Sequence, residues 1–372
     1  ARLKLGGEGL VFDKDGNPLQ SISLHTIWPN QDFVRERVDI TPKAKGGEEI
    51  SLTAEVSAGQ LMGLVLENDK ANMMAESYGN YEAAVEELSL SVFRDDIQAL
   101  YYDVLILNDQ MKALDEKSVR RNRILSIFQK AINCFDNSPE NIQKTRKILK
   151  RELDKPAAAS DLTTTAVGHA HLDTAWLWPL SETVRKCART FINQVENIEK
   201  YSDYIFGASQ PQHYLFVKEY YPKIYEKIKK LVKAGRWEPQ GGMWVEADCN
   251  LISGESMVRQ ILHGKNFFLE EFGVDVKNLW LPDVFGYSAA MPQIIRKSGM
   301  DYFITQKLSW NQFNKFPHHT FIWQGIDGSK VITHFPPEDN YNSELLPSAL
   351  KKAQENFAEN YMLDEFLSLC GI

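Results

Sequence analysis

The apolar positions of the chain change their spacing along the sequence, and each change predicts a different kind of element. Residues 50–56 alternate apolar and polar side chains, which is typical of a half-buried strand. From about Tyr81 to Leu153 the apolar side chains recur every three or four residues, as on the buried face of a helix. We therefore expect a partial β-domain over residues 1–80, followed by a helical segment and a linker over residues 81–160.

Beyond a proline-bearing linker at residues 154–160, strand-like and helix-like segments alternate. The expected strands span 164–168, 204–208, 237–245, 279–282 and 302–305, and the expected helices span 181–200, 214–233, 253–272 and 291–297. Such alternation predicts an α/β fold with a parallel sheet and covering helices. An open doubly wound sheet and a (β/α) barrel share this pattern. We favour the barrel for residues 161–372, because no glycine-rich phosphate loop follows the first strand.

Composition narrows the classes of protein that the chain can represent. The 372 residues include 42 basic and 50 acidic side chains, a net charge of −8 that gathers into no long block, so no nucleic-acid partner is expected. No apolar run reaches the ~18 residues of a membrane helix, and no leader is recognisable at Ala1. The four cysteines lie far apart without a CxxC pair, which favours a reducing cytoplasm over a disulfide scaffold.

The first chemical signal is the segment His169-Ala-His-Leu-Asp173, where the first strand of the expected barrel ends. Residues two apart on an extended backbone point the same way, so His171 and Asp173 can converge on one metal, with His169 on that face. The alternative is a strand end whose histidines are hydrogen-bonded structural groups. Three ionisable groups at alternate positions favour a metal site over a structural role. The spacing alone does not identify the kind of enzyme, because it recurs in unrelated metal hydrolases.

The second chemical signal is the segment Leu279–Tyr287, an apolar strand that runs into a carboxylate and a glycine turn. Asp283 stands at the carboxyl end of that strand, where barrel enzymes carry their catalytic groups. The alternative is that Asp283 caps the helix expected from about Ala289. The intervening Phe285-Gly286-Tyr287 makes a direct cap awkward, so a functional role is favoured.

Together these segments resemble glycoside hydrolase family 38, the α-mannosidases, and within it the cytosolic or bacterial type. The resemblance covers about Thr163 to the end of the chain and is looser upstream. It rests on residues 169–173 with Trp176, and on residues 237–246, 281–287 and 305–311, with a weaker match at 24–30.

The resemblance implies a seven-stranded (β/α) barrel-like catalytic domain that holds one zinc ion. The positions that match the family's zinc ligands are His171, Asp173 and Asp283, and Asp283 also matches its nucleophile. In this family the 2- and 3-hydroxyls of mannose reach the zinc while the aspartate attacks the anomeric carbon, so the glycosidic bond is hydrolysed with retention. Another divalent metal such as cobalt stays open.

The resemblance also implies residues that contact the substrate, an oligosaccharide with a terminal α-linked mannose. Trp176 and Phe285 match aromatic positions that line the mannose subsite, for which core packing is the alternative interpretation. Lys307 and Trp310, in the last matching segment, are expected to contact the substrate as well.

Two functional groups of the family are expected beyond Ile372: a fourth zinc ligand, a histidine, and the acid/base aspartate. The chain by itself is therefore expected to be inactive or nearly so, unless Glu246 or Asp248 supplies the proton. Three histidines match no ligand position and are interpreted as structural or rim residues: His318, His319 and His334.

Two other functions remain as alternatives. A metal-dependent polysaccharide deacetylase also uses a (β/α) barrel, but it typically carries an HxxxH pair, and no two histidines here have that spacing. A catalytically inactive carbohydrate-binding fragment is the second alternative. Linkage preference stays open, and the resemblance is compatible with a homo-oligomer of the full-length protein.

Overall fold

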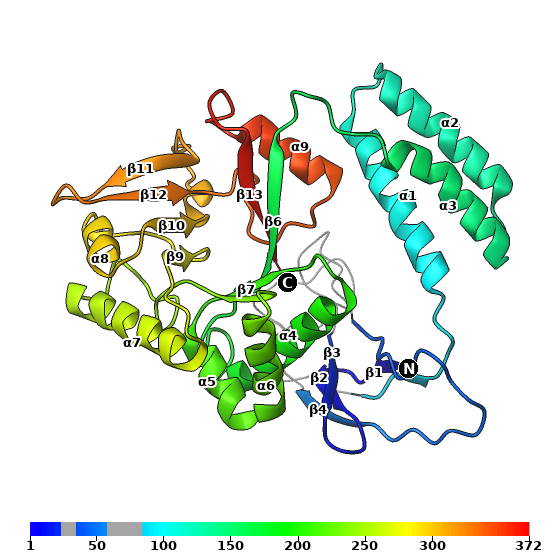
Figure 1. Ribbon diagram of the computed structural model, residues 1–372, viewed down its shortest axis with the longest axis horizontal. Helices are drawn as coiled ribbons and strands as arrows, with labels where there is room; N and C mark the ends of the chain where they lie inside the picture. Colours follow the sequence, from blue (N-terminus) through cyan, green and yellow to red (C-terminus); the bar gives the residue numbers. More distant parts are fainter. Residues whose placement is uncertain (24–34, 58–83, 372) are drawn as a thin grey trace.

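The computed structural model describes residues 1–23, 35–57 and 84–371, which form a mixed α/β structure (Figure 1). The weaker family match at 24–30 and the expected helix start at Tyr81 lie outside these ranges. None of the helices within them combines the length and the apolar character that a membrane crossing demands.

The first expected strand of the barrel lies in a four-stranded parallel sheet. Its strands are β6 (Thr163–His169), β7 (Phe206–Ala208), β8 (Trp237–Pro239) and β13 (Glu365–Gly371), in the order β13-β6-β7-β8. All three pairings are parallel, so the carboxyl ends of the four strands lie at one edge.

A second four-stranded sheet carries the strand that precedes Asp283. It has the order β11-β12-β10-β9 and contains β9 (Asn278–Leu281), β10 (Tyr302–Thr305), β11 (Thr320–Gln324) and β12 (Lys330–His334). β9, β10 and β12 are parallel, and β11 returns antiparallel to β12. Among the described strands no ladder joins the two sheets, so the closed seven-stranded barrel is not confirmed.

The break between the sheets follows from the sequence after β8. The expected strand over 237–245 ends at Pro239, which lacks the N–H that a ladder needs. Gly241 and Gly242 then take φ of +93° and +68°, which turns the chain out of the sheet. The N–H of Gly241 donates to the side-chain Oδ1 of Asn278 (2.8 Å) at the start of β9, a single contact in place of a ladder.

Helices cover the parallel strands, with two differences from the expectation: residues 347–356 form a helix that was not expected, and one expected helix is two. They are α4 (Leu180–Lys200), α5 (Pro211–Tyr220), α6 (Pro222–Lys233), α7 (Gly254–Phe272), α8 (Met291–Lys297) and α9 (Pro347–Asn356). The single helix expected over 214–233 is two, because Tyr221 before Pro222 takes a non-helical φ of −133° and ψ of 57°. The Ser253 side chain caps α7 as expected, accepting from the N–H of Ser256.

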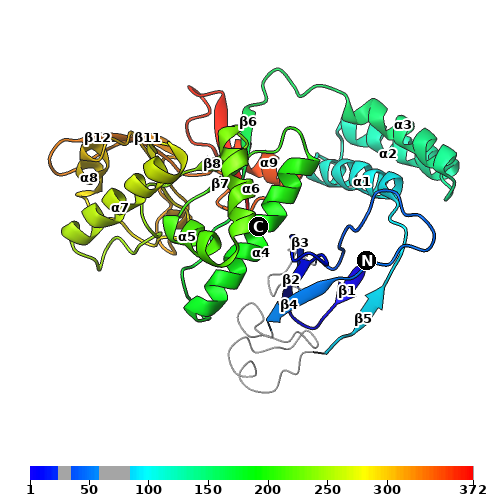
Figure 2. The same cartoon turned by 60° about the horizontal axis from the view of Figure 1, so that its bottom comes forward.

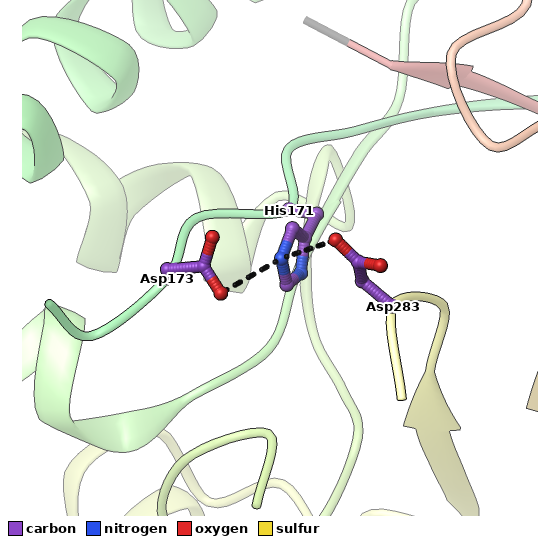
Figure 3. Close-up of side chains that lie close together, drawn as sticks. All are labelled: His171, Asp173 and Asp283. Carbon is purple, nitrogen blue, oxygen red and sulfur yellow. Dashed lines mark ion pairs between the residues drawn. The ribbon is translucent and has the colours of Figure 1, made fainter. Parts of the chain in front are cut away.

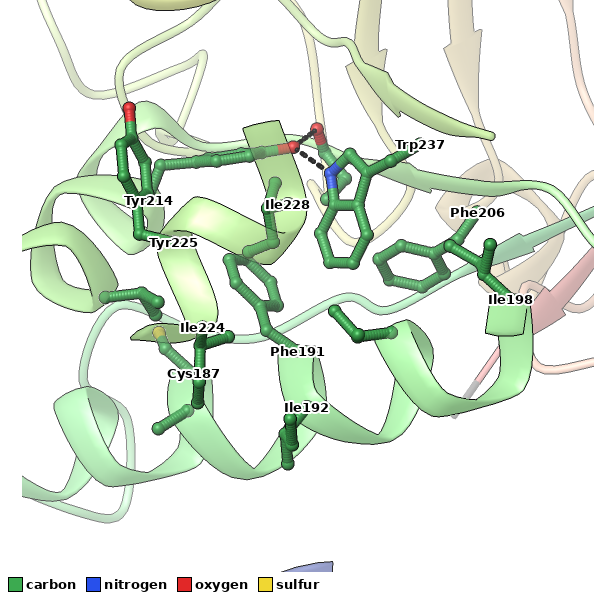
Figure 4. Close-up of a cluster of buried hydrophobic side chains, with 14 of the residues drawn as sticks. Cys187, Phe191, Ile192, Ile198, Phe206, Tyr214, Ile224, Tyr225, Ile228 and Trp237 are labelled. Carbon is green, nitrogen blue, oxygen red and sulfur yellow. Dashed lines mark hydrogen bonds between the residues drawn. The ribbon is translucent and has the colours of Figure 1, made fainter. Parts of the chain in front are cut away.

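An aromatic core joins the first sheet to its helices (Figure 4). The ring of Trp237 lies edge-on to Phe206 from β7 and Phe191 from α4, with centroids 4.7 and 5.1 Å apart. Its indole N–H donates to the hydroxyl of Tyr214 (2.9 Å), which in turn donates to the carbonyl of Ala208 (2.9 Å). The buried indole N–H and the buried hydroxyl are therefore both paired, and the second bond ties Tyr214 to the end of β7.

The amino-terminal strands form one sheet of three strands and a separate pair. The strands are β1 (Arg2–Lys4), β2 (Glu8–Phe12), β3 (Pro18–Ile22), β4 (Thr53–Ser57) and β5 (Glu87–Ser89). The three-stranded sheet, β3-β2-β4, packs on the outer side of α4, and β1-β5 is the separate pair (Figure 2). β4, close to the expected strand at 50–56, pairs with β2. Glu8 of β2 meets Lys186 (3.0 Å) and Arg189 (2.7 Å) of α4, so its buried charge is paired across the contact.

Three helices separate these strands from β6: α1 (Asp95–Ala113), α2 (Val119–Cys134) and α3 (Pro139–Leu153). The expectation of a helical pattern from the region of Tyr81 is wrong for the described residues 84–94. Residues 88–92 read Leu-Ser-Leu-Ser-Val, whose alternation is that of a strand, and β5 there pairs antiparallel with β1. Leu88 and Val92 are consequently exposed instead of lying on a buried helix face.

Candidate metal centre and active site

The chemically distinctive residues follow the carboxyl ends of three parallel strands. His171 and Asp173 come after β6, Glu246 follows the turn after β8, and Asp283 comes after β9. Ligands and catalytic groups of α/β proteins gather at such strand ends, because the loops there converge on one side of the sheet. The structure brings these residues together although the two sheets are separate.

His171, Asp173 and Asp283 form a group whose ligand atoms all lie within 4.8 Å of one another (Figure 3). The Nε2 of His171 lies 3.4 Å from Asp173 Oδ1 and 3.2 Å from Asp283 Oδ2. Ligand atoms at ~2.0–2.2 Å from one tetrahedral ion stand about 3.3–3.6 Å apart. The two separations from Nε2 are close to this range, and the two aspartate oxygens lie within 4.8 Å of each other.

The donor set fits a metal ion because one ring nitrogen of His171 is hydrogen-bonded and the other has no hydrogen-bond partner among the described residues. Nδ1 lies 2.7 Å from Oε2 of the buried Glu246, so it carries the proton and donates it. Nε2 is buried and makes no hydrogen bond of acceptable geometry, although both aspartates are close to it. Nε2 therefore points at the two carboxylates, which is the orientation that a metal-binding imidazole nitrogen requires.

Electrostatics lead to the same conclusion. Burial lowers the pKa of His171, but the charge of Glu246 and the contacts with Asp173 and Asp283 outweigh it and raise the pKa well above its usual range. Without a metal the ring is thus a cation that balances the surrounding carboxylates. A divalent ion can replace that proton and neutralise the same charges.

Glu246 is held in place by neighbours from the loop after β7. The hydroxyl of Ser209 donates to Glu246 Oε1 (2.6 Å), and the N–H of Glu246 donates to Oε1 of Gln210 (3.2 Å). The amide of Gln210 also donates to the carbonyl of Leu172 (2.9 Å), beside His171. The sequence indicated Glu246 only as a substitute proton donor. Its position after a parallel strand is the signal that could have assigned it to the site.

Asp283 is the most strongly stabilised carboxylate of the site. The ammonium of Lys307 lies 2.7 Å from Oδ1, and the hydroxyl of Tyr341 donates to Oδ2 (2.9 Å). Burial raises the pKa of Asp283, but His171 and Lys307 outweigh burial and lower it to about 2. Sequence reasoning missed Tyr341, because it lies in a loop after β12 that carries no recognisable motif.

Three aromatic side chains expected to contact substrate are strongly exposed, so core packing does not account for them. Phe285 is 66% and Trp310 58% exposed, and their rings meet edge-on with centroids 5.7 Å apart. The buried Lys307 Nζ lies 3.4 Å from the ring centroid of Trp310 and 4.9 Å from that of Phe285. Trp176 is 52% exposed and packs edge-on against Trp178.

His169 does not join the metal group. Its ring is buried, its Nε2 contacts the backbone carbonyl of Tyr341, and burial lowers its pKa to about 4. β6 ends at His169, and both His169 and His171 lie against the ring of Tyr341, but only His171 belongs to the metal group. Asp283 does not cap α8, whose N-cap is Ala290 without a side-chain hydrogen bond.

The three histidines that matched no ligand position, His318, His319 and His334, also lie outside the metal group and bond to the backbone or to side chains nearby. His319 Nδ1 accepts from the N–H of Ala358 (3.1 Å), and His334 Nδ1 lies 2.8 Å from the hydroxyl of Thr320. His318 Nδ1 lies 2.9 Å from a carboxylate oxygen of Glu359.

Comparison with known families matches residues 161–372 to the family described as "Glycosyl hydrolases family 38 N-terminal domain". This match covers more than half of the chain, and the chain belongs to glycosyl hydrolase family 38.

Two curated relatives are similar over nearly the whole chain. It is 40% identical to Alpha-mannosidase 2C1 of Mus musculus, over 91% of this chain and 32% of that protein. It is 40% identical to Alpha-mannosidase G of Dictyostelium discoideum, over 98% of this chain and 33% of that protein. The chain thus spans about a third of the length of these relatives. Among solved structures, an alpha-mannosidase from Enterococcus faecalis V583 has a TM-score of 0.47 at 20% identity, over 57% of this chain and 25% of that one.

The ion pair between Lys307 and Asp283 makes a measurable prediction for the metal-free chain. With a pKa of about 2, the Asp283 carboxylate stabilises the fold fully above the unfolded-state value of ~3.9, and this contribution is lost as the pH falls through about 2. Replacing Lys307→Met should raise the Asp283 pKa by ~1–3 pH units, because an adjacent cation is removed. Carboxyl ¹³C NMR titration measures it.

The matched control is Lys330→Met, which removes an exposed lysine from β12 and should leave the Asp283 titration where it is. An Asp283 pKa that is the same in both variants would show that Lys307 does not stabilise the carboxylate.

Proposed function

We propose that the chain carries the metal-binding and nucleophilic part of an α-mannosidase, which removes terminal α-linked mannose from oligosaccharides by a zinc-assisted retaining mechanism. Membership of family 38 and the names of the relatives support the reaction class. The observation that carries the proposal is the position of Asp283. One of its oxygens faces the metal-binding nitrogen of His171, and the other faces Lys307.

Zinc is the metal that the donor set suits best, with cobalt as the alternative. One imidazole and two carboxylates, His171, Asp173 and Asp283, would hold it, which is a donor set typical of catalytic zinc sites with an open position. When bound, zinc orients the sugar hydroxyls and offsets the negative charge of the site. Glu246 fixes the ring orientation and the tautomer of His171.

Asp283 would act as the nucleophile because its low pKa keeps the carboxylate ionised near neutral pH and because each of its two oxygens has a partner that orients it. Its carboxylate forms a bond to the anomeric carbon while the bond to the leaving oxygen breaks, and a water molecule later cleaves the glycosyl ester. Lys307 and the Tyr341 hydroxyl orient the carboxylate. Both contacts also lower its basicity, which the pairing of the sugar with the metal must offset.

Protonation of the leaving oxygen needs a second carboxyl group. Glu246 is unsuited to this role, because it is buried and bound to His171 and Ser209. Asp248 accepts from the backbone N–H groups of Asn250 and Leu251, and so serves a turn. The two acids considered from the sequence therefore have structural partners of their own.

The exposed rings of Trp176, Phe285 and Trp310 would provide apolar faces for the sugar, with Lys307 below them. The two parallel sheets would form one barrel-like layer around the small core that Trp280, Ile304 and Leu369 share. A cytoplasmic location is also proposed, since all four cysteines are free. No observation in the described structure favours the deacetylase reading.

Trapping of the glycosyl ester tests the proposed nucleophile directly. In a 5-fluoro-α-mannosyl fluoride the leaving group is fluoride, which departs without a proton. The sugar keeps the 2- and 3-hydroxyls that the proposed zinc site would bind. The zinc-loaded chain should therefore gain the mass of one fluoromannosyl group even where an acid is lacking. Peptide mass spectrometry should place that group on Asp283.

The Asp283→Asn variant, which is isosteric but not nucleophilic, should stay unlabelled, as should the wild type treated with the corresponding glucosyl fluoride. A label on another residue, or equal labelling of the Asn variant, would rule out Asp283 as the nucleophile.

The hydrogen bond from His171 to Glu246 predicts a change in metal affinity. Glu246→Gln keeps the shape but removes the charge that increases the basicity of the imidazole, so zinc affinity should fall by ~10–100-fold. Chelator competition measures it without any reliance on turnover. Glu255→Gln, at an exposed glutamate in the first turn of α7, is the matched control and should bind zinc as the wild type does. Equal affinities for the two variants would exclude a role for Glu246 at the metal.

A further inference from the structure

A cavity lies at the carboxyl ends of β10 and β12, and its lining residues have no role in the proposed chemistry. Its volume is ≈ 260 Å³, and it is lined by the loop after β10, from Gln306 to His319, and by residues 335–339 after β12. Loops at this edge of a parallel sheet are where α/β enzymes bind their ligands.

This cavity adjoins Asp283 through one short element. The 3₁₀ helix Lys307–Trp310 directs Lys307 toward Asp283 and carries Trp310 beside Phe285. Gln306, before the helix, and Ser309, within it, line the cavity. The cavity and Asp283 therefore lie on either side of a single turn of chain.

Gln306 gives the cavity an unpaired acceptor. Its side chain is only 3% exposed, and its amide nitrogen donates to the hydroxyl of Ser309 (2.5 Å). Its Oε1 is buried and has no hydrogen-bond partner among the described residues. A buried acceptor without a donor costs free energy, so this position suits a hydroxyl supplied from outside.

The rest of the lining is typical of a site for a neutral sugar. Asn311 and Asn314 contribute amides, and the single charges of Lys315 and Asp339 oppose each other, so no net charge selects an ion. Phe313 is 90% exposed at this cavity and can cover the face of a pyranose ring. The volume is below the ~300–1,000 Å³ of pockets for drug-sized ligands, which leaves room for one hexose.

We propose that this cavity binds the second sugar of an oligosaccharide whose terminal mannose lies at Asp283. The inference rests on the proposed function, since the first sugar must occupy the metal site. Gln306 Oε1 accepts a hydrogen bond from a hydroxyl of the second sugar, and Phe313 packs on its ring. The cavity thereby selects oligosaccharides over simple mannosides.

The test compares two ligands that the zinc-loaded chain cannot consume: methyl α-mannoside and a methyl α-mannobioside whose two sugars are joined through sulfur. Calorimetry should show tighter binding of the disaccharide by about tenfold, the size of effect expected from one or two added contacts. In Phe313→Ala and in Gln306→Met this gain should fall to about twofold or less, while methyl α-mannoside binds as before. Tyr361→Ala removes another strongly exposed aromatic ring, 79% exposed, outside the cavity and should keep the full gain.

The outcomes separate the two proposals. Wild type that binds methyl α-mannoside but gains nothing from the second sugar overturns the second-sugar site alone. A gain that survives in Phe313→Ala, whose exposed ring is not needed for folding, overturns it as well. Wild type that binds neither ligand contradicts the proposed function together with the site that rests on it.

Discussion

The arrangement of this site depends on how the imidazole of His171 is held. Glu246 holds Nδ1 at 2.7 Å, and two aspartates stand 3.2 and 3.4 Å from Nε2. Three carboxylates around one ring are costly to bury unless a positive charge balances them. In the metal-free chain a proton on the ring would supply that charge, since the surrounding carboxylates raise the pKa of His171. The same demand makes the position suitable for a divalent ion.

The surrounding fold serves to bring these groups to one place. Asp283 and Glu246 follow strands of only four and three residues, so the loops reach the centre soon after each strand ends. The turn that leads to Glu246 passes close to α7, where any side chain at Gly264 would collide with the backbone of Gly242. The aromatic core around Trp237 fixes the strand from which that turn starts. Packing far from the metal group therefore sets the position of a residue that touches it.

Much of the parallel architecture could be predicted from the sequence, because apolar runs and caps are local signals. The strand that ends before His171, the Ser253 cap and the strand before Asp283 are of this kind. The break at Tyr221 was missed, since both halves of the helix keep the same apolar spacing across it. The helix expected over residues 88–92 was also wrong, because a few apolar residues fit a helical period as well as an alternating one.

The candidate site was predicted where ligands stand beside a strand end, as for His171, Asp173 and Asp283. It was not predicted where a partner comes from a distant loop without a motif. Tyr341 reaches Asp283 from beyond β12, and His169 turns toward the carbonyl of Tyr341 instead of the metal group. Such pairings depend on how loops pass one another, which no spacing within one segment encodes.

The central claim is that His171, Asp173 and Asp283 together bind one metal ion. Anomalous diffraction at the zinc edge, from crystals of the chain prepared with one equivalent of zinc, tests it most directly. The account predicts a single peak bonded to His171 Nε2 and to one oxygen of each aspartate, at ~2.0–2.2 Å. A zinc ion bound elsewhere on the chain, or one attached to Nδ1 of His171 with Glu246 displaced, would contradict it.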